Sequence, residues 1–113
     1  MEAAARFEDW NPTHFLDVAE MSLAVSLGYD LLYSYMSEAE RATIKSALMR
    51  HCLSMAAQIY DPSLAASKRT ANTFGWVTRD HNWNSVCNCG MLAAALVVAD
   101  EEADLCRLVV KGK

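Results

Sequence analysis

The sequence has few of the residues that interrupt helices, with only four glycines and two prolines among 113 residues. Glycine and proline punctuate local structure more strongly than other residues, so their scarcity argues against a turn-rich fold. Alanine, leucine and methionine are abundant instead, and 53% of the residues are hydrophobic. A chain of this length and composition can bury a core in one domain. We therefore predict an all-α fold and a single helical domain over residues 1–113.

Runs of basic residues and long apolar runs are also missing. Fourteen acidic residues oppose ten scattered basic residues, which gives a net charge of −4. This pattern excludes a polybasic patch for nucleic acid or for a membrane surface. The longest apolar run, residues 91–99, is far shorter than the roughly 20 residues of a spanning helix. We expect neither nucleic acid nor a membrane as a partner.

The N-terminal residues lack the pattern of a secretory signal. An acidic residue follows Met1, and Glu8 and Asp9 stand where an apolar segment is required. Export therefore has no support in the chain as it stands. The four cysteines lack the spacing of a small disulfide scaffold, so we expect mostly reduced and buried thiols at Cys52, Cys87, Cys89 and Cys106.

Two helices are expected in the first half of the chain. Apolar residues spaced by three and four predict a helix over residues 12–35, with Asn11 as its N-cap. Its apolar stripe consists of Phe15, Leu16, Val18, Ala19, Leu23, Ala24, Leu27, Leu31 and Leu32. Gly28, inside this helix, indicates close packing against a neighbour. The segment Ser37-Glu-Ala-Glu40 is a capping box that opens a second helix over residues 38–59. The short connection predicts an antiparallel hairpin.

A long loop and two more helices are expected in the second half. Residues 61–80 break the helical rhythm, and loops of this length are usually functional or disordered. A third helix is predicted over residues 84–99, and a fourth over residues 101–110 with Asp100 as its cap. Two helical hairpins joined by a long loop are the organisation of a helical repeat or toroid.

Polar residues gather where the third helix is expected to begin. Residues 78–91 hold a histidine, several asparagines and Trp83 directly before an apolar helix. Unpaired N–H groups and the dipole at a helix N-terminus favour a negatively charged group. Amides, a ring nitrogen and an indole N–H are thus expected to converge on an anionic or sugar-like ligand. Trp76 and Trp83 flank Arg79 and His81 and suggest a carbohydrate-facing wall. The alternative is that both tryptophans pin the loop to the core.

Three blocks of residues resemble the helical domain of heparinase II/III-like polysaccharide lyases. They are Trp10-Asn-Pro-Thr-His-Phe-Leu-Asp-Val-Ala-Glu20, then Gly28-Tyr-Asp30, then His81-Asn-Trp-Asn-Ser-Val-Cys-Asn-Cys-Gly90. The resemblance spans residues 9–108. It implies an (α/α) toroid, usually followed by β-sandwich domains, and cleavage of uronic-acid-containing polysaccharide by β-elimination. It also suggests a periplasmic or secreted location.

The resemblance implies roles for particular residues. In such lyases an asparagine, often beside a histidine, neutralises the uronate carboxylate so that the C5 proton becomes acidic. This places Asn82 and His81 in catalytic positions. The residues expected to bind substrate are Asn84, Trp83, Trp76, Arg79, Tyr29 and Glu20. No cofactor and no metal is expected.

A complete toroid requires many more helices than this chain supplies. The chain is therefore expected to be a fragment of a larger toroid, inactive alone, with an acidic polysaccharide or oligosaccharide as its ligand. Faces that pack on neighbouring hairpins in a whole toroid predict self-association or missing downstream domains as partners.

Two interpretations from other classes remain open. The chain is alternatively a non-catalytic helical interaction module or carbohydrate-binding module, in which Tyr29, Glu20 and the asparagine-rich turn are structural. The other open interpretation is a metal site formed by His81, Cys87 and Cys89. Cys87 and Cys89 would point about 200° apart on a helix, which disfavours shared coordination.

Overall fold

The computed structural model describes residues 1–61, 75–78 and 80–112, and every regular element in them is helical, which confirms the predicted all-α class. The α-helices are α1 (Glu2–Ala5), α2 (Phe15–Leu32), α3 (Glu38–His51), α4 (Ala56–Tyr60), α6 (Asn82–Val97) and α7 (Ala103–Gly112). Short 3-10 helices cover Tyr33–Tyr35, Leu53–Met55 and Gly75–Thr78.

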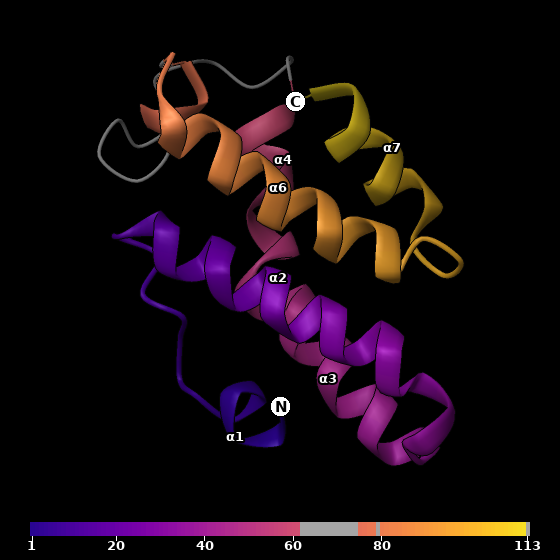
Figure 1. The fold of residues 1–113 in the computed structure, drawn as a ribbon. Coiled ribbons are helices and arrows are strands. Elements are labelled where there is room, and N and C mark those ends of the chain that lie inside the picture. Colours follow the sequence, from indigo (N-terminus) through magenta and orange to yellow (C-terminus); the bar gives the residue numbers. More distant parts are fainter. Residues whose placement is uncertain (62–74, 79, 113) are drawn as a thin grey trace.

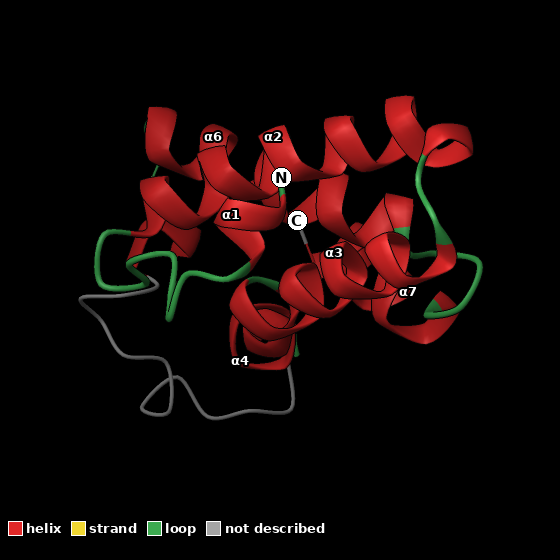
Figure 2. Ribbon diagram, turned by 90° about the horizontal axis from the view of Figure 1, so that it is seen from below, coloured by secondary structure: helices red, strands yellow, loops and turns green. Residues whose placement is uncertain are grey.

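The helices form two layers. Helices α2 and α6 lie side by side and run in the same direction, with both N-termini at one end (Figure 1). Helices α3, α4 and α7 form the layer beneath them (Figure 2). The core between the layers holds the largest fully buried side chains, among them Phe15, Ile44, Leu48, Ile59 and Met91. Two successive helical hairpins therefore place their first helices, α2 and α6, next to each other.

Helix α2 begins later than the sequence predicts. Its first residue is Phe15 and its N-cap is His14, so the predicted cap at Asn11 is wrong. Asn11 instead has a φ of 57°, a left-handed conformation that asparagine tolerates better than most residues. Its side-chain amide donates to Asp17 Oδ2 at 2.7 Å. Asn11 therefore turns the chain into the helix without capping it.

The buried face of α2 is only partly the predicted one. Phe15, Val18 and Ala19 are buried as expected, but the three leucines at 27, 31 and 32 are exposed. The inward positions further along the helix belong to Ser22, Val25, Ser26 and Tyr29. These positions follow the three- and four-residue spacing of one helical face. Because apolar residues also occupy the opposite face, hydrophobicity alone did not identify the buried side.

Close contact between α2 and α6 depends on Gly90. A Cβ atom at this position would lie 2.5 Å from the carbonyl oxygen of Ala19 and 2.6 Å from its Cα. A Cβ at Gly28 would meet only side-chain atoms of Met1. The glycine that permits a close helix approach is thus Gly90, whereas the sequence had suggested Gly28.

The start of the second helix is the predicted one, but its course is not. Ser37 Oγ accepts from the Glu40 N–H at 3.1 Å, and Glu40 Oε1 accepts from the Ser37 N–H at 3.4 Å, which confirms the capping box. The expected continuous helix over residues 38–59 is wrong, because the chain breaks at Cys52 into a 3-10 turn and α4. Ser54 Oγ donates to the Arg50 carbonyl at 2.8 Å. Such bonds back to the preceding turn commonly bend helices.

The last two helices also differ from the predicted boundaries. Helix α6 begins at Asn82, two residues before the predicted start, and α7 begins at Ala103. Asp100 does not cap α7, because it lies in a turn in which the N–H groups of Glu101 and Glu102 donate to the Val98 carbonyl. Among the described residues, no helix has the length and apolarity needed to cross a membrane.

Candidate functional site

The N-terminal ends of α2 and α6 meet at one edge of the upper layer (Figure 1). The His14 and Trp83 rings stack edge to face, with centroids 5.0 Å apart and planes at 83°. We call His14, His81, Asn82 and Trp83 the helix-mouth cluster. Each helix carries partial positive charge at this end, because its first N–H groups have no intrahelical partner. The parallel packing of α2 and α6 therefore brings two positive helix ends together.

His81 caps α6 through its ring. The backbone at this residue is extended, with φ −153° and ψ 176°. Its Nδ1 accepts a hydrogen bond from the Trp83 N–H at 3.1 Å. In a neutral imidazole, an accepting Nδ1 places the proton on Nε2. The exposed His81 ring thus keeps an N–H donor for a ligand while it satisfies one free amide of the helix.

Asn82 is the first residue of α6 and is exposed. Its side-chain amide has no hydrogen-bond partner among the described residues, so its N–H and C=O groups are open to solvent. Trp83 is half-buried and rests against His14. His81, Asn82 and Trp83 therefore present a ring N–H, a side-chain amide and an aromatic surface at one helix start.

Asn84 points into the protein. Its Nδ2 donates to the carbonyl oxygens of Trp76 and Val77, both at 3.1 Å. Its Oδ1 accepts from Asn88 Nδ2 at 3.1 Å, and Asn88 Oδ1 accepts from the Tyr60 hydroxyl at 2.7 Å. This chain of amides ties α4 and the 75–78 turn to the first two turns of α6. The Asn84 side chain thus positions the helix start and is not free for a ligand.

We expect Asn84→Ala to lower the free energy of unfolding by about 1–3 kcal/mol, because the half-buried amide network would lose its central member. Urea denaturation followed by circular dichroism measures the change. Ser85→Ala, at the exposed neighbouring residue, is the control and should change stability by less than about 0.5 kcal/mol. Equal urea midpoints for the two variants would show that the network contributes little.

The remaining predicted site residues lie elsewhere. Trp76 is 3% exposed and packs against Phe15 with ring centroids 5.1 Å apart, so it belongs to the core. Glu20 is exposed and borders a groove beside Phe7. Tyr29 follows Phe15 by fourteen residues, about 21 Å along the helix axis. Arg79 lies outside the described residues. The structure thus gathers His81, Asn82 and Trp83, and separates them from Tyr29.

Sequence reasoning missed His14. The histidine lies three residues before Asp17, and its Nδ1 is 3.2 Å from Asp17 Oδ1. This i, i+3 spacing beside the turn was the available signal. Hydrogen bonds from Asn11 and then from His14 hold the pKa of Asp17 below its ordinary value. Asp17 therefore stays ionised and places a carboxylate in the first turn of α2.

The two helix starts differ in charge. Helix α2 has Asp17 in its first turn, whereas the first turn of α6 contains no acidic residue. The carboxylate of Asp17 already offsets the positive end of α2. The first turn of α6, which begins at Asn82, has no carboxylate of its own, although Asp80 precedes the cap at His81.

The structure does not support a metal site at His81, Cys87 and Cys89. In the part of the chain that the structure describes, no three His, Cys, Asp or Glu side chains gather closely enough to hold a metal ion. Cys87 is buried in the core while Cys89 is exposed on the other side of α6. His81 uses its Nδ1 for the cap.

No protein-family model matches the sequence, and no curated protein matches it.

Proposed function

We propose that this chain is part of the (α/α) toroid of a heparinase II/III-like polysaccharide lyase, and that the helix-mouth cluster binds a carboxylate of uronic-acid-containing polysaccharide. One observation carries the proposal. The side-chain amide of Asn82 is exposed and has no hydrogen-bond partner among the described residues, at a helix start that has no acidic residue in its first turn. The sequence resemblance independently assigns the neutralising role to the same residue.

The chemistry of β-elimination explains why an amide suits this position. The C5 proton of a uronate becomes acidic only when the adjacent carboxylate is neutralised. An N–H donor from Asn82, helped by the His81 Nε2–H, would stabilise the charge that develops on the carboxylate as the proton leaves. Trp83 offers an aromatic surface to the apolar face of a sugar ring. The base and the acid of the reaction are expected in hairpins beyond residues 1–113.

The arrangement of the helices also supports a toroid. Two hairpins in sequence place α2 and α6 in one layer and their return helices in the other (Figure 2). Repeating this step would extend both layers, because each hairpin offers a face to the next.

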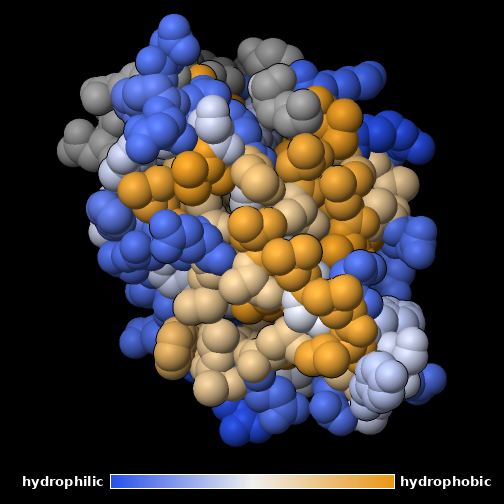
Figure 3. Space-filling model, in the orientation of Figure 1, coloured by the Kyte–Doolittle hydropathy of each residue, from blue (hydrophilic) through white to orange (hydrophobic). Residues whose placement is uncertain are grey.

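Exposed hydrophobic residues support packing with further helices. Hydrophobic side chains gather over α2 and α6 on the face seen in Figure 3. Leu27, Leu31 and Leu96 are 53%, 73% and 55% exposed. Apolar patches on helices mark surfaces that another protein element covers. This observation favours missing hairpins or self-association, and it equally suits the second candidate, a non-catalytic interaction or carbohydrate-binding module.

We expect an oligouronate to bind the chain, and Asn82→Ala to weaken the binding about tenfold, because the variant loses a hydrogen bond to a charged group. Isothermal titration calorimetry at low ionic strength measures both affinities. Gln58→Ala removes an exposed amide from α4, outside the cluster, and should leave the affinity unchanged.

Equal binding by wild type and Asn82→Ala would contradict the proposed site. The isolated chain should produce no unsaturated uronate, measured by the ultraviolet absorbance of the new double bond. Product formation by this chain would refute its assignment as an inactive part of a lyase.

A further inference from the structure

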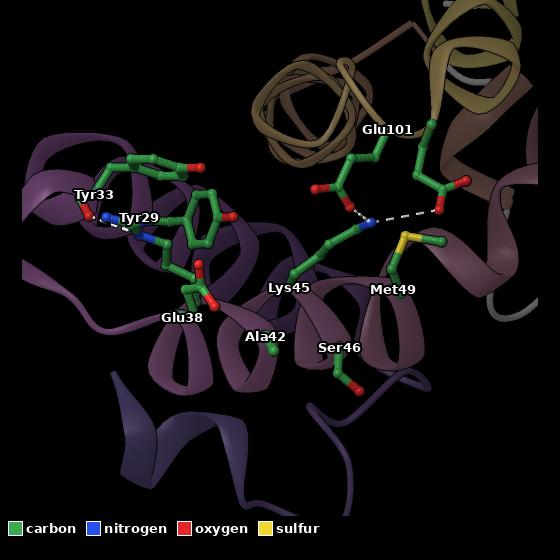
Figure 4. Close-up of a pocket in the computed structure, with 10 residues that line it drawn as sticks. Tyr29, Tyr33, Glu38, Ala42, Lys45, Ser46, Met49 and Glu101 are labelled. Carbon is green, nitrogen blue, oxygen red and sulfur yellow. Dashed lines mark hydrogen bonds and ion pairs between the residues drawn. The ribbon is translucent and has the colours of Figure 1, made fainter.

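A pocket lies at the opposite end of α2 from the helix-mouth cluster. Its volume is about 620 Å³, and it is bounded by the end of α2, one face of α3 and the turn before α7 (Figure 4). We call it the tyrosine pocket, after Tyr29 and Tyr33. Its α3 wall is formed by Glu38, Ala42, Lys45 and Met49, which recur on one helical face.

The two cationic side chains that line the tyrosine pocket, Lys45 and Arg41, already have partners within the protein. The Lys45 ammonium pairs with Glu101 and lies 3.6 Å from Glu102 Oε1. The hydrogen bond that Lys45 donates to the Glu101 carboxylate raises the pKa of Lys45, so the ammonium stays charged. The Arg41 guanidinium lies 4.0 Å from the centre of the Tyr33 ring, and its Nε donates to the Tyr33 carbonyl at 2.9 Å. An anionic ligand would have to compete with these contacts.

Tyr29 offers a hydroxyl that the protein does not use. The residue is only 8% exposed, and its hydroxyl has no hydrogen-bond partner in the described part of the chain. The hydroxyl end points into the pocket, toward the side that holds Lys45 and Glu101 (Figure 4). Burial raises the pKa of Tyr29, which keeps the hydroxyl protonated and able to accept a hydrogen bond. The Tyr29 ring is buried, whereas its hydroxyl oxygen reaches the open space of the pocket, where a ligand group can replace water as its partner.

The charges around the pocket favour a cation. Three carboxylates and two cations line it. Glu101 and Glu102 face Lys45, whereas the Glu38 side chain has no hydrogen bond or ion pair among the described residues. Glu38 therefore contributes a carboxylate without a partner at the pocket wall. The chain as a whole also carries a charge of −4, which attracts cations over distance.

We propose that the tyrosine pocket binds a primary alkylammonium group. The ammonium donates hydrogen bonds to the Glu38 carboxylate and to the Tyr29 hydroxyl oxygen. Its alkyl chain lies against Ala42, the apolar residue one turn from Glu38 on the same wall. The group belongs either to a small free amine or to a lysine side chain of another protein. This proposal is independent of the lyase assignment and concerns a different end of the molecule.

Titration calorimetry with three probes of similar shape tests the charge preference. We expect butylammonium to bind at least about tenfold more tightly than butyrate or butanol, because only the ammonium matches the unpaired carboxylate. Tyr29→Phe removes the hydroxyl but keeps the buried ring, and Glu38→Gln removes the charge but keeps the shape. Each variant should weaken butylammonium binding at least about fivefold.

The controls lie close to the pocket but outside its lining. Tyr35→Phe alters a tyrosine that is 86% exposed, and Asp30→Asn alters an exposed carboxylate. Both should bind butylammonium like the wild type. Thermal unfolding monitored by circular dichroism verifies that each variant is folded at the titration temperature.

A second amine distinguishes the two sources of the ammonium. Binding of Nα-acetyl-lysine N-methylamide with the same dependence on Tyr29 and Glu38 would support a lysine side chain as the natural ligand. Binding of butylammonium alone would support a small free amine. Butyrate binding as tightly as butylammonium, or wild-type affinity in both Tyr29→Phe and Glu38→Gln, would overturn the proposal.

Discussion

Gly90→Ala is expected to lower the free energy of unfolding by about 2–4 kcal/mol, although alanine favours a helix over glycine by about 1 kcal/mol. The new Cβ would meet three backbone atoms of Ala19 within 2.9 Å. Backbone atoms in a packed helix cannot rotate away, so α2 and α6 would have to separate along their shared contact. Urea denaturation followed by circular dichroism measures the loss.

Gly28→Ala provides the matched control. This glycine is also inside a helix, but its added Cβ would meet only side-chain atoms of Met1, which can move aside. The variant should be as stable as the wild type or more stable by up to about 1 kcal/mol. If Gly90→Ala and Gly28→Ala behaved alike, α2 and α6 could not approach each other as closely at Gly90 as the contact with Ala19 requires.

The second large effect concerns the cysteines. Burial raises the pKa of both Cys52 and Cys87 to about 12. At about pH 8 only about one in ten thousand of these groups is a thiolate, the form that reacts with alkylating agents. Cys89 is exposed. We expect iodoacetamide to modify Cys89 at least about a thousandfold faster than Cys52 or Cys87, measured by mass spectrometry of peptides over time.

Two controls accompany the labelling experiment. Cys89→Ser should remove the fast modification, and unfolding in urea should bring Cys52 and Cys87 to the rate of a free thiol. Rapid labelling of Cys52 in the native protein would contradict its burial. The same shifts predict alkaline instability. A pKa raised by folding stabilises the protein below the ordinary thiol pKa of 9.0, and this contribution is lost as the pH rises toward about 12.

Local signals allowed accurate prediction of some elements. The capping box at Ser37 and Glu40 was predicted to the residue, because both of its hydrogen bonds join positions three apart. The break at Cys52 was not predicted, since the preceding residues have a continuous helical pattern. The cap at His14 was missed because Asn11 and the following proline gave a stronger local signal than the turn that Asp17 stabilises.

In the candidate sites too, features set by neighbouring residues were predicted, and features set by distant residues were not. The exposure of His81 and Asn82 followed from their place before an apolar helix, although α6 begins two residues earlier than predicted. The inward orientation of Asn84 was not predicted, because its partners are distant in the sequence. They include carbonyls of the 75–78 turn and, through Asn88, the Tyr60 hydroxyl. The tyrosine pocket was not predicted from the sequence, because Lys45 and Glu101 are far apart in the chain and come together only in the folded protein.

The parallel pairing of α2 with α6 has a consequence for biosynthesis. Ala19 is made about 70 residues before Gly90, an interval of several seconds at ordinary rates of translation. During that time the face of α2 that later packs against α6 is exposed. A nascent chain halted before residue 82 should therefore recruit general chaperones more strongly than one that includes α6.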